Sequence, residues 1–201
     1  MKLHKLNLKK NFKIKNLCLC IGNFDGIHKG HQFVIKKIIK HSRDFKMKSA
    51  IMTFNPHPKI FFKKNGGAFN IITSDYKKLF LNSLGIQNYI EYSFNKTLSN
   101  LSAIEFIEKV LVKQLNVRKI IVGNDFRFGK NRSGDTKLLK SLSSKYNYKL
   151  ISISHIKNNN THLKYSSSAI RKNIEKGQFE KVTEALGRSW QMNGKVIKGK
   201  Q

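Results

Sequence analysis

The chain has 201 residues, of which 40 are Lys or Arg and 11 are Asp or Glu, so its formal net charge is +29. Its longest apolar runs cover four to six residues, which excludes a transmembrane helix, and its first sixteen residues lack the continuous apolar segment of a signal peptide. We therefore expect a cytoplasmic protein with no membrane partner, long enough to bury a core without disulfides.

Apolar runs typical of strands alternate with segments of helical periodicity along the chain. The expected strands span residues 16–22, 48–54, 88–92, 117–123 and 149–154, with a further strand at 194–200. The expected helices span residues 29–42, 75–85, 102–115 and 135–146, and two more end at Gly177 and Leu186. This alternation predicts an α/β fold of Rossmann-like type, in which helices flank a parallel sheet of about five strands.

Side chains at the expected helix starts support these boundaries. Ser102 and Glu105 form a capping-box pattern, and Asp135 stands where an N-cap is expected. Either Ser166 or Ser167 caps the helix that ends at Gly177.

The polar, Gly-rich and His-rich segments of the chain follow the expected strands. They are GNFDGIHKGH (22–31), FNPHP (54–58), GNDFRFG (123–129) and HLKYSSSAIR (162–171). In a parallel sheet, ligands bind beyond the carboxyl ends of the strands. We therefore expect these four segments to build one site.

The segment GNFDGIHKGH has the composition of a phosphate-binding turn. Gly22 and Gly26 allow a sharp turn and a close approach of the backbone to a ligand. His28 and His31 are three residues apart at the start of a helix, whose free N–H groups and positive dipole end attract phosphate. Two imidazoles without a third ligand make a poor transition-metal site, so the pattern favours phosphate over metal.

The large positive charge has two explanations. It could form a surface that binds a polyanion such as RNA. However, 34 of the 40 basic residues are Lys and only six are Arg, and Asn and Ile are also abundant. These residue types share A/T-rich codons, and selected phosphate sites favour Arg. We therefore expect no specific nucleic-acid partner.

Cys18 and Cys20, the only cysteines, alternate in an expected strand and are interpreted as buried reduced thiols.

GNFDGIHKGHQ (22–32) resembles the signature of the nucleotidylyltransferase superfamily. More narrowly, it resembles the FMN adenylyltransferase (FAD synthetase) module of bacterial bifunctional riboflavin kinase/FAD synthetases. Further segments resemble that module in the same order: TFNPHP (53–58), VGNDFRFGKNRSGD (122–135), YSSSAIR (165–171) and ALGRSW (185–190). The resemblance implies transfer of AMP from ATP to FMN, with Mg²⁺ assisting. It also implies a catalytic domain over residues 1–186 and, over 187–201, the truncated start of a riboflavin kinase-like β-barrel.

The resemblance also implies roles for individual residues. The expected catalytic residues are His28, His31, Ser167 and Arg171. The expected ATP-binding residues are Gly22, Asn23, Phe24, Asp25, Gly26, Asp125, Lys164 and Ser168, and Asp125 is also a candidate for orienting Mg²⁺. The expected FMN-binding residues are Asn55, Pro56, Phe62, Phe126 and Phe128.

Alternatives remain at several of these positions. Phe126 and Phe128 suit stacking on a planar ring, but they would equally anchor their loop to the core. Lys164 and Ser168 stand where the family usually has Arg and Thr. At the level of function, the alternatives are a nucleotidylyltransferase that uses a different phosphate acceptor, and a basic RNA-binding protein on the same scaffold.

Overall fold

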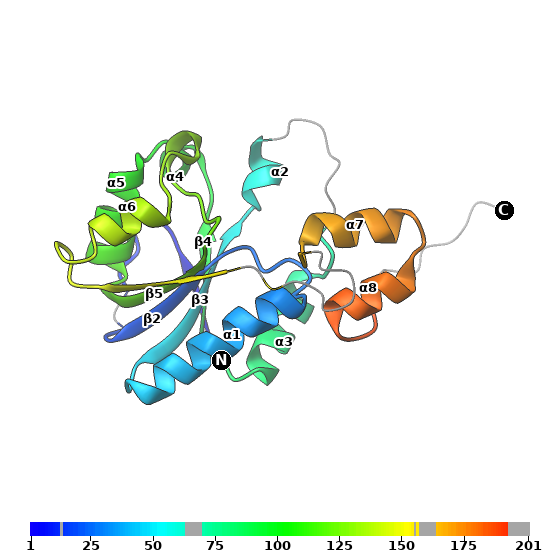
Figure 1. Ribbon diagram of the computed structural model, residues 1–201. Helices are drawn as coiled ribbons and strands as arrows, with labels where there is room; N and C mark the ends of the chain where they lie inside the picture. Colours follow the sequence, from blue (N-terminus) through cyan, green and yellow to red (C-terminus); the bar gives the residue numbers. More distant parts are fainter. Residues whose placement is uncertain (13, 63–69, 155, 157–163, 193–201) are drawn as a thin grey trace.

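The computed structural model describes residues 1–12, 14–62, 70–154, 156 and 164–192 (Figure 1). Within these residues, six strands form one sheet in the order β1-β4-β3-β2-β5-β6, and every neighbouring pair is parallel. The strands are β1 (Lys2–Leu6), β2 (Leu17–Ile21), β3 (Lys48–Asn55), β4 (Asn88–Ser93), β5 (Val117–Gly123) and β6 (Lys149–Ile153). The α/β fold and the parallel sheet are confirmed.

The prediction of about five strands missed β1, which forms an edge of the sheet and pairs only with β4. Its sequence, KLHKL, contains no apolar run, and Leu6 is its one buried residue. An edge strand needs few apolar side chains, so its pairing leaves little signal in the sequence. The strand expected at 194–200 lies outside the described residues.

The six helical segments expected from the sequence are present in order, and the short helical elements at 58–62, 96–99 and 130–132 were not predicted. The described helical elements are α1 (Lys29–Asp44), α2 (Pro58–Phe62), α3 (Ser74–Ser83), α4 (Lys96–Ser99), α5 (Ala103–Glu105), the π-helix η1 (Phe106–Gln114), the 3₁₀ turn η2 (Lys130–Arg132), α6 (Thr136–Ser141), α7 (Ser167–Glu175) and α8 (Phe179–Leu186). The capping box of Ser102 and Glu105 and the N-cap at Asp135 are confirmed. Ser166, not Ser167, caps α7, because its side chain accepts the hydrogen bond from the Ala169 amide.

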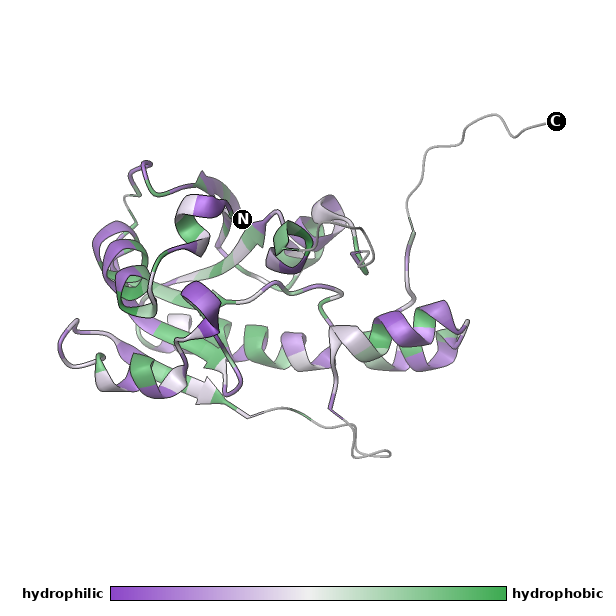
Figure 2. Ribbon diagram, turned by 90° about the horizontal axis from the view of Figure 1, so that it is seen from above, coloured by the Kyte–Doolittle hydropathy of each residue, from purple (hydrophilic) through white to green (hydrophobic). Residues whose placement is uncertain are grey.

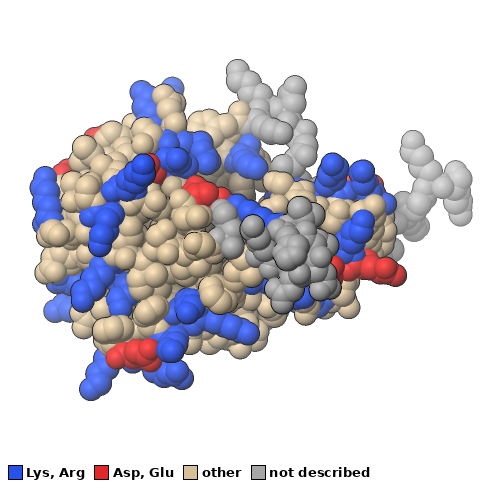
Figure 3. All heavy atoms as spheres, viewed as in Figure 1, with Lys and Arg blue, Asp and Glu red and all other residues tan. Residues whose placement is uncertain are grey.

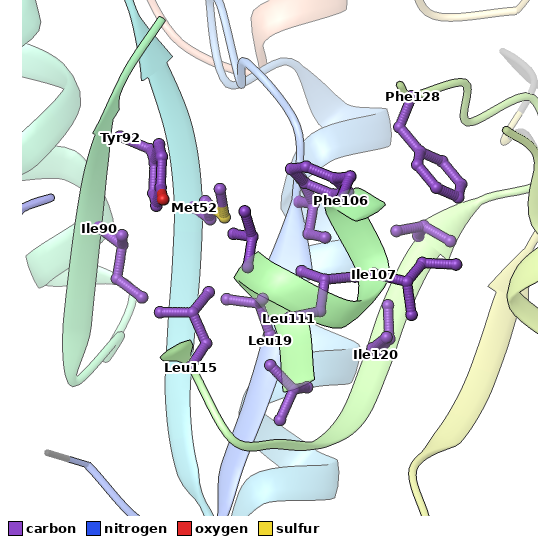
Figure 4. Close-up of a cluster of buried hydrophobic side chains, with 14 of the residues drawn as sticks. Leu19, Met52, Ile90, Tyr92, Phe106, Ile107, Leu111, Leu115, Ile120 and Phe128 are labelled. Carbon is purple, nitrogen blue, oxygen red and sulfur yellow. The ribbon is translucent and has the colours of Figure 1, made fainter. Parts of the chain in front are cut away.

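Helices cover both faces of the sheet, and each face has its own apolar core. On one face, side chains of η1 such as Phe106 and Leu111 pack against Leu19 and Ile120 (Figure 4). On the other face, α1, α3, α7 and α8 bury Ile35, Ile38, Leu81, Ile170 and Val182. The strands are mainly hydrophobic, whereas hydrophilic residues gather on the outer helices and loops (Figure 2).

Both cysteines lie beneath α1 in the second core, free and buried as expected, and burial raises the pKa of each thiol. Among the described residues, no helix is long and apolar enough to cross a membrane. The cations on the face shown in Figure 3 are spread among uncharged side chains and do not form one dense patch.

Candidate functional site

A pocket of about 280 Å³ opens at the carboxyl ends of β2, β5 and β6. The starts of α1 and α7 complete its wall, so the first, third and fourth of the predicted segments meet there. The lining residues are Cys20, Ile21, Gly22, Phe24, His28, Gly30, His31, Val34, Gly123, Asp125, Ile153, Ser154, Ile156, Lys164, Tyr165, Ser166 and Ser167. The pocket thus brings together seven predicted site residues: Gly22, Phe24, His28, His31, Asp125, Lys164 and Ser167.

His28 and His31 are the centre of this pocket. His28 is the N-cap of α1, and its Nδ1 accepts a hydrogen bond from the His31 backbone N at 3.3 Å. The two rings stack with their centroids 3.7 Å apart. Since Nδ1 is the acceptor, the neutral ring carries its proton on Nε2, which remains as a donor. His28 therefore offers a hydrogen-bond donor to an anion.

The surroundings keep both imidazoles neutral. Burial, followed by the charges of Lys164 and Arg188, lowers the pKa of His28 to about 4. Burial, followed by the charge of His28, lowers the pKa of His31 well below its usual value. Among the described residues, the buried Nδ1 atom of His31 has no hydrogen-bond partner. An unpaired polar atom of this kind suits a site that a polar ligand completes.

The turn before α1 needs its glycines. Gly26 has φ +81°, a left-handed conformation that side chains rarely adopt, and an added β-carbon would also lie 3.2 Å from the Ile71 side chain. At Gly30, a β-carbon would lie 3.1 Å from Nδ1 of His28. Side chains at these positions would strain the turn or displace the capping imidazole.

Asp25 lies behind the pocket and does not line it. Its carboxylate is 2% exposed, forms an ion pair with Arg171 and accepts a hydrogen bond from the Ile71 amide at 3.0 Å. Its backbone carbonyl accepts a hydrogen bond from Oγ of Ser167 at 2.8 Å. Asp25 therefore connects the turn before α1 to α7, through its ion pair with Arg171 and its hydrogen bond from Ser167.

Asp125 and Lys164 form an ion pair of 2.9 Å at the pocket, with both side chains partly exposed. Among the described residues, no group of three His, Cys, Asp or Glu side chains is placed to hold a metal ion. Asp125 is the one carboxylate among the lining residues given above. The described part of the pocket thus offers a cation one carboxylate, that of Asp125, as an oxygen ligand.

The residues expected to bind FMN lie beside the pocket, after β3 and β5. Phe128 is 7% exposed and packs against Phe126 and Phe106, with ring centroids 5.5 and 5.6 Å apart, so it anchors its loop to the core. Phe62 in α2 is 64% exposed and has two ring neighbours, Phe61 at 5.3 Å and Phe94 at 5.7 Å. Asn55 and Pro56 end β3 and begin the turn to α2. Phe62 therefore has free ring surface, and Phe128 has little.

Sequence analysis missed some residues of the site. Gly30 and Tyr165 line the pocket and lie inside two of the four segments, whereas Ser154, which also lines it, is the last residue of the strand expected at 149–154. Arg188 lies inside ALGRSW (185–190), which resembles the family, but no role was predicted for it. Its guanidinium contacts the turn before α1 from a position 162 residues further along the chain, and no local pattern predicts such a contact.

The family model described as FAD synthetase matches residues 11–169. The chain belongs to the FAD synthetase family. It is 36% identical over 193 residues to a bifunctional riboflavin kinase/FMN adenylyltransferase of Buchnera aphidicola (Schizaphis graminum), covering 96% of this chain and 61% of that protein. It is 32% identical over 200 residues to an FAD synthetase of Listeria monocytogenes, covering 99% of this chain and 80% of the relative.

The family membership confirms the resemblance inferred from the motifs. A second bifunctional relative, from Buchnera aphidicola (Acyrthosiphon pisum), is 36% identical, and the chain spans only 58% of its length. Among solved structures, the chain is similar to a macrolide-efflux protein from Streptococcus pneumoniae, with a TM-score of 0.81 and 25% identity over 94% of this chain and 63% of that one. This likeness supports the fold described above.

Proposed function

We propose that this member of the FAD synthetase family transfers AMP from ATP to FMN and releases pyrophosphate. An oxygen of the FMN phosphate forms a bond to the α-phosphorus of ATP while the bond from that phosphorus to the bridging oxygen breaks. The electron pair of the broken bond leaves with pyrophosphate. The observation that carries this proposal is the stacked pair of imidazoles of His28 and His31 at the start of α1, inside a pocket at the strand ends.

The ATP phosphates would lie against the start of α1. There the Nε2–H of His28, the ammonium of Lys164 and the free backbone N–H groups of the helix converge. The hydroxyl group of Ser167, which lines the pocket, and that of Ser168 next to it would extend this surface. Hydrogen bonds of this kind stabilise the charge that develops on the transferred phosphoryl group, and positioning of the two phosphates supplies the rest.

Asn23, Asp25 and Gly26 would support the ATP site by shaping the turn before α1. Arg171 holds Asp25 in the structure. In the complex we expect Arg171 to remain with Asp25 or to reach the leaving phosphates, and in either case its charge favours their binding.

Mg²⁺ would enter with ATP, since among the described residues of the pocket lining Asp125 is the one carboxylate. Mg²⁺ commonly binds through one or two carboxylates together with substrate phosphates, so Asp125 fits as its one protein ligand. The ion would neutralise phosphate charge, and the ammonium of Lys164, which pairs with Asp125 at 2.9 Å, would share that task.

FMN would bind beside the pocket, across the ends of β3 and β5. Phe62 offers an exposed ring for the isoalloxazine, and Phe126 is the more accessible aromatic of its loop. Asn55 and Pro56 would form the edge of this site. Phe128 would contribute by holding the loop in place.

The test is adenylyl transfer by the purified chain. ATP and FMN with Mg²⁺ should yield FAD, detected by chromatography, and pyrophosphate in equal amounts. Phosphopantetheine and nicotinamide mononucleotide serve as competing acceptors of the same reaction class. Pyrophosphate release with either of these, but not with FMN, would refute the proposed acceptor. Tight RNA binding with a steep salt dependence and no transfer would favour the RNA-binding alternative.

A further inference from the structure

Arg188 lies just after α8, far from the pocket in sequence, yet its guanidinium contacts the turn that carries His28. One terminal nitrogen donates to the carbonyl oxygen of Gly26 at 2.7 Å. The other donates to the carbonyl oxygens of Ile27 and Leu186, both at 3.2 Å. Gly26 and Ile27 immediately precede His28. The guanidinium therefore forms hydrogen bonds with the backbone next to the residue whose imidazole caps α1.

These carbonyl groups need such a partner. Gly26 and Ile27 are buried, and their φ values of 81° and 41° belong to no helix or strand. A buried carbonyl without a hydrogen bond is costly. The carbonyl oxygens of Ile27 and Leu186 also accept hydrogen bonds from Nε2 of Gln32, at 2.9 and 2.8 Å. The Gly26 carbonyl, in contrast, accepts a hydrogen bond from Arg188 alone among the described residues.

The guanidinium itself is held from the opposite side. It lies over the ring of Phe80, 4.2 Å from the centroid, and over Tyr76, 5.6 Å from the centroid. Its Nε also donates to the Tyr76 hydroxyl oxygen at 3.3 Å. The planar guanidinium is held between α3 and the turn before α1, which leaves it few other conformations. The position of that turn therefore depends on the positions of α3 and α8.

We propose that Arg188 is a positioning residue of the phosphate site, which fixes the carbonyl groups of Gly26 and Ile27 and thereby sets the place of the His28 imidazole. The family model ends at residue 169, so Arg188 lies outside the matched segment. Its kinetic consequence rests on the proposed function, but its structural consequence does not.

Lysine should replace Arg188 poorly. The contacts to Gly26, Ile27 and Leu186 use both arms of a planar fork, whereas an ammonium is a single point charge on a flexible stem. Tyr76→Phe is the matched control, because it removes only the hydroxyl that accepts from Nε and leaves the carbonyl contacts and the ring in place.

The experiment compares wild type, Arg188→Met, Arg188→Lys and Tyr76→Phe. Three measurements are made on each: kcat and KM for FAD formation, the Kd for Mg·ATP by calorimetry, and the ¹⁵N resonances of the His28 ring. We expect kcat to fall about 100-fold in Arg188→Met, as for a misplacement of about 1 Å. Arg188→Lys should recover less than half of that loss on a logarithmic scale. Tyr76→Phe should stay within about twofold of wild type.

The His28 resonances separate positioning from a general loss of stability. In wild type we expect the pattern of a neutral ring protonated on Nε2, and in Arg188→Met a mixture of tautomers. A variant with a lower melting temperature but unchanged kcat, Kd and His28 spectrum would overturn the proposal, and so would full rescue by Lys. Arg188→Lys is the variant to use if Arg188→Met does not fold. If wild type makes no FAD, the proposed function fails, while the His28 spectrum still tests Arg188.

Discussion

Nδ1 of His28 accepts a hydrogen bond from the backbone N of His31, and the two rings stack 3.7 Å apart. One nitrogen of His28 is therefore occupied by the helix, and the other remains for a ligand. The same side chain both caps α1 and contributes to the pocket.

The two roles of His28 can be separated by substitution. Asn is a good N-cap and Ala is a poor one, but neither has an imidazole. We expect His28→Asn and His28→Ala both to lose about 100-fold or more in kcat for FAD formation, as when one transition-state donor is removed. Urea unfolding should show His28→Ala about 1 kcal/mol less stable than His28→Asn. Equal stability of the two variants would mean that the cap contributes nothing.

Acid should destabilise the protein through the same residue. The pKa of His28 is about 4 in the folded protein, against 6.5 for an ordinary His, so the unfolded chain binds more protons between these values. Its contribution to stability is complete above about pH 6.5 and is lost as the pH falls from there towards 4. Urea unfolding at pH 5 and pH 7.5 measures the loss. The difference between the two pH values should be smaller in His28→Asn than in wild type.

The buried ion pair of Asp25 and Arg171 should matter more for stability than any exposed pair. Removing one partner leaves the other charge buried, so we expect Asp25→Asn to reduce the free energy of unfolding by about 3 kcal/mol. The double variant with Arg171→Met should lose less than the sum of the single variants. Strictly additive losses in urea unfolding would contradict the coupling of the two residues.

For Lys164, in contrast to Asp25, we expect a small effect on stability and a larger effect on ATP binding. Its ion pair with Asp125 is partly exposed on both sides, so Lys164→Met should change the free energy of unfolding by less than about 1 kcal/mol. The same substitution removes a cation from the pocket and should raise KM for ATP about tenfold, with a smaller effect on KM for FMN. An unchanged KM for ATP would exclude Lys164 from the phosphate site.

The two phenylalanines that follow different strands should respond differently to truncation. Phe128→Ala empties a buried position and should cost about 3 kcal/mol in unfolding free energy. Phe62→Ala removes an exposed ring and should leave stability nearly unchanged while weakening FMN binding, measured by flavin fluorescence. Unchanged FMN affinity in Phe62→Ala would remove α2 from the flavin site.

The order of the elements and the place of the motifs could be read from the amino-acid sequence. The patterns behind α1, β2, β5 and their caps extend over a few neighbouring residues, and the repeat of strand and helix is enough to place the motifs at one edge of a parallel sheet. GNFDGIHKGH therefore predicted a pocket that the structure contains.

The tertiary structure alone decided which side chains meet. β1 joined the sheet through pairing with β4, Arg171 met Asp25 from 146 positions away, and Phe128 packed into the core. The Arg188 contacts with Gly26 belong to the same class. Such partners are selected by the packing of distant segments, and the periodicity of a local stretch carries no information about them.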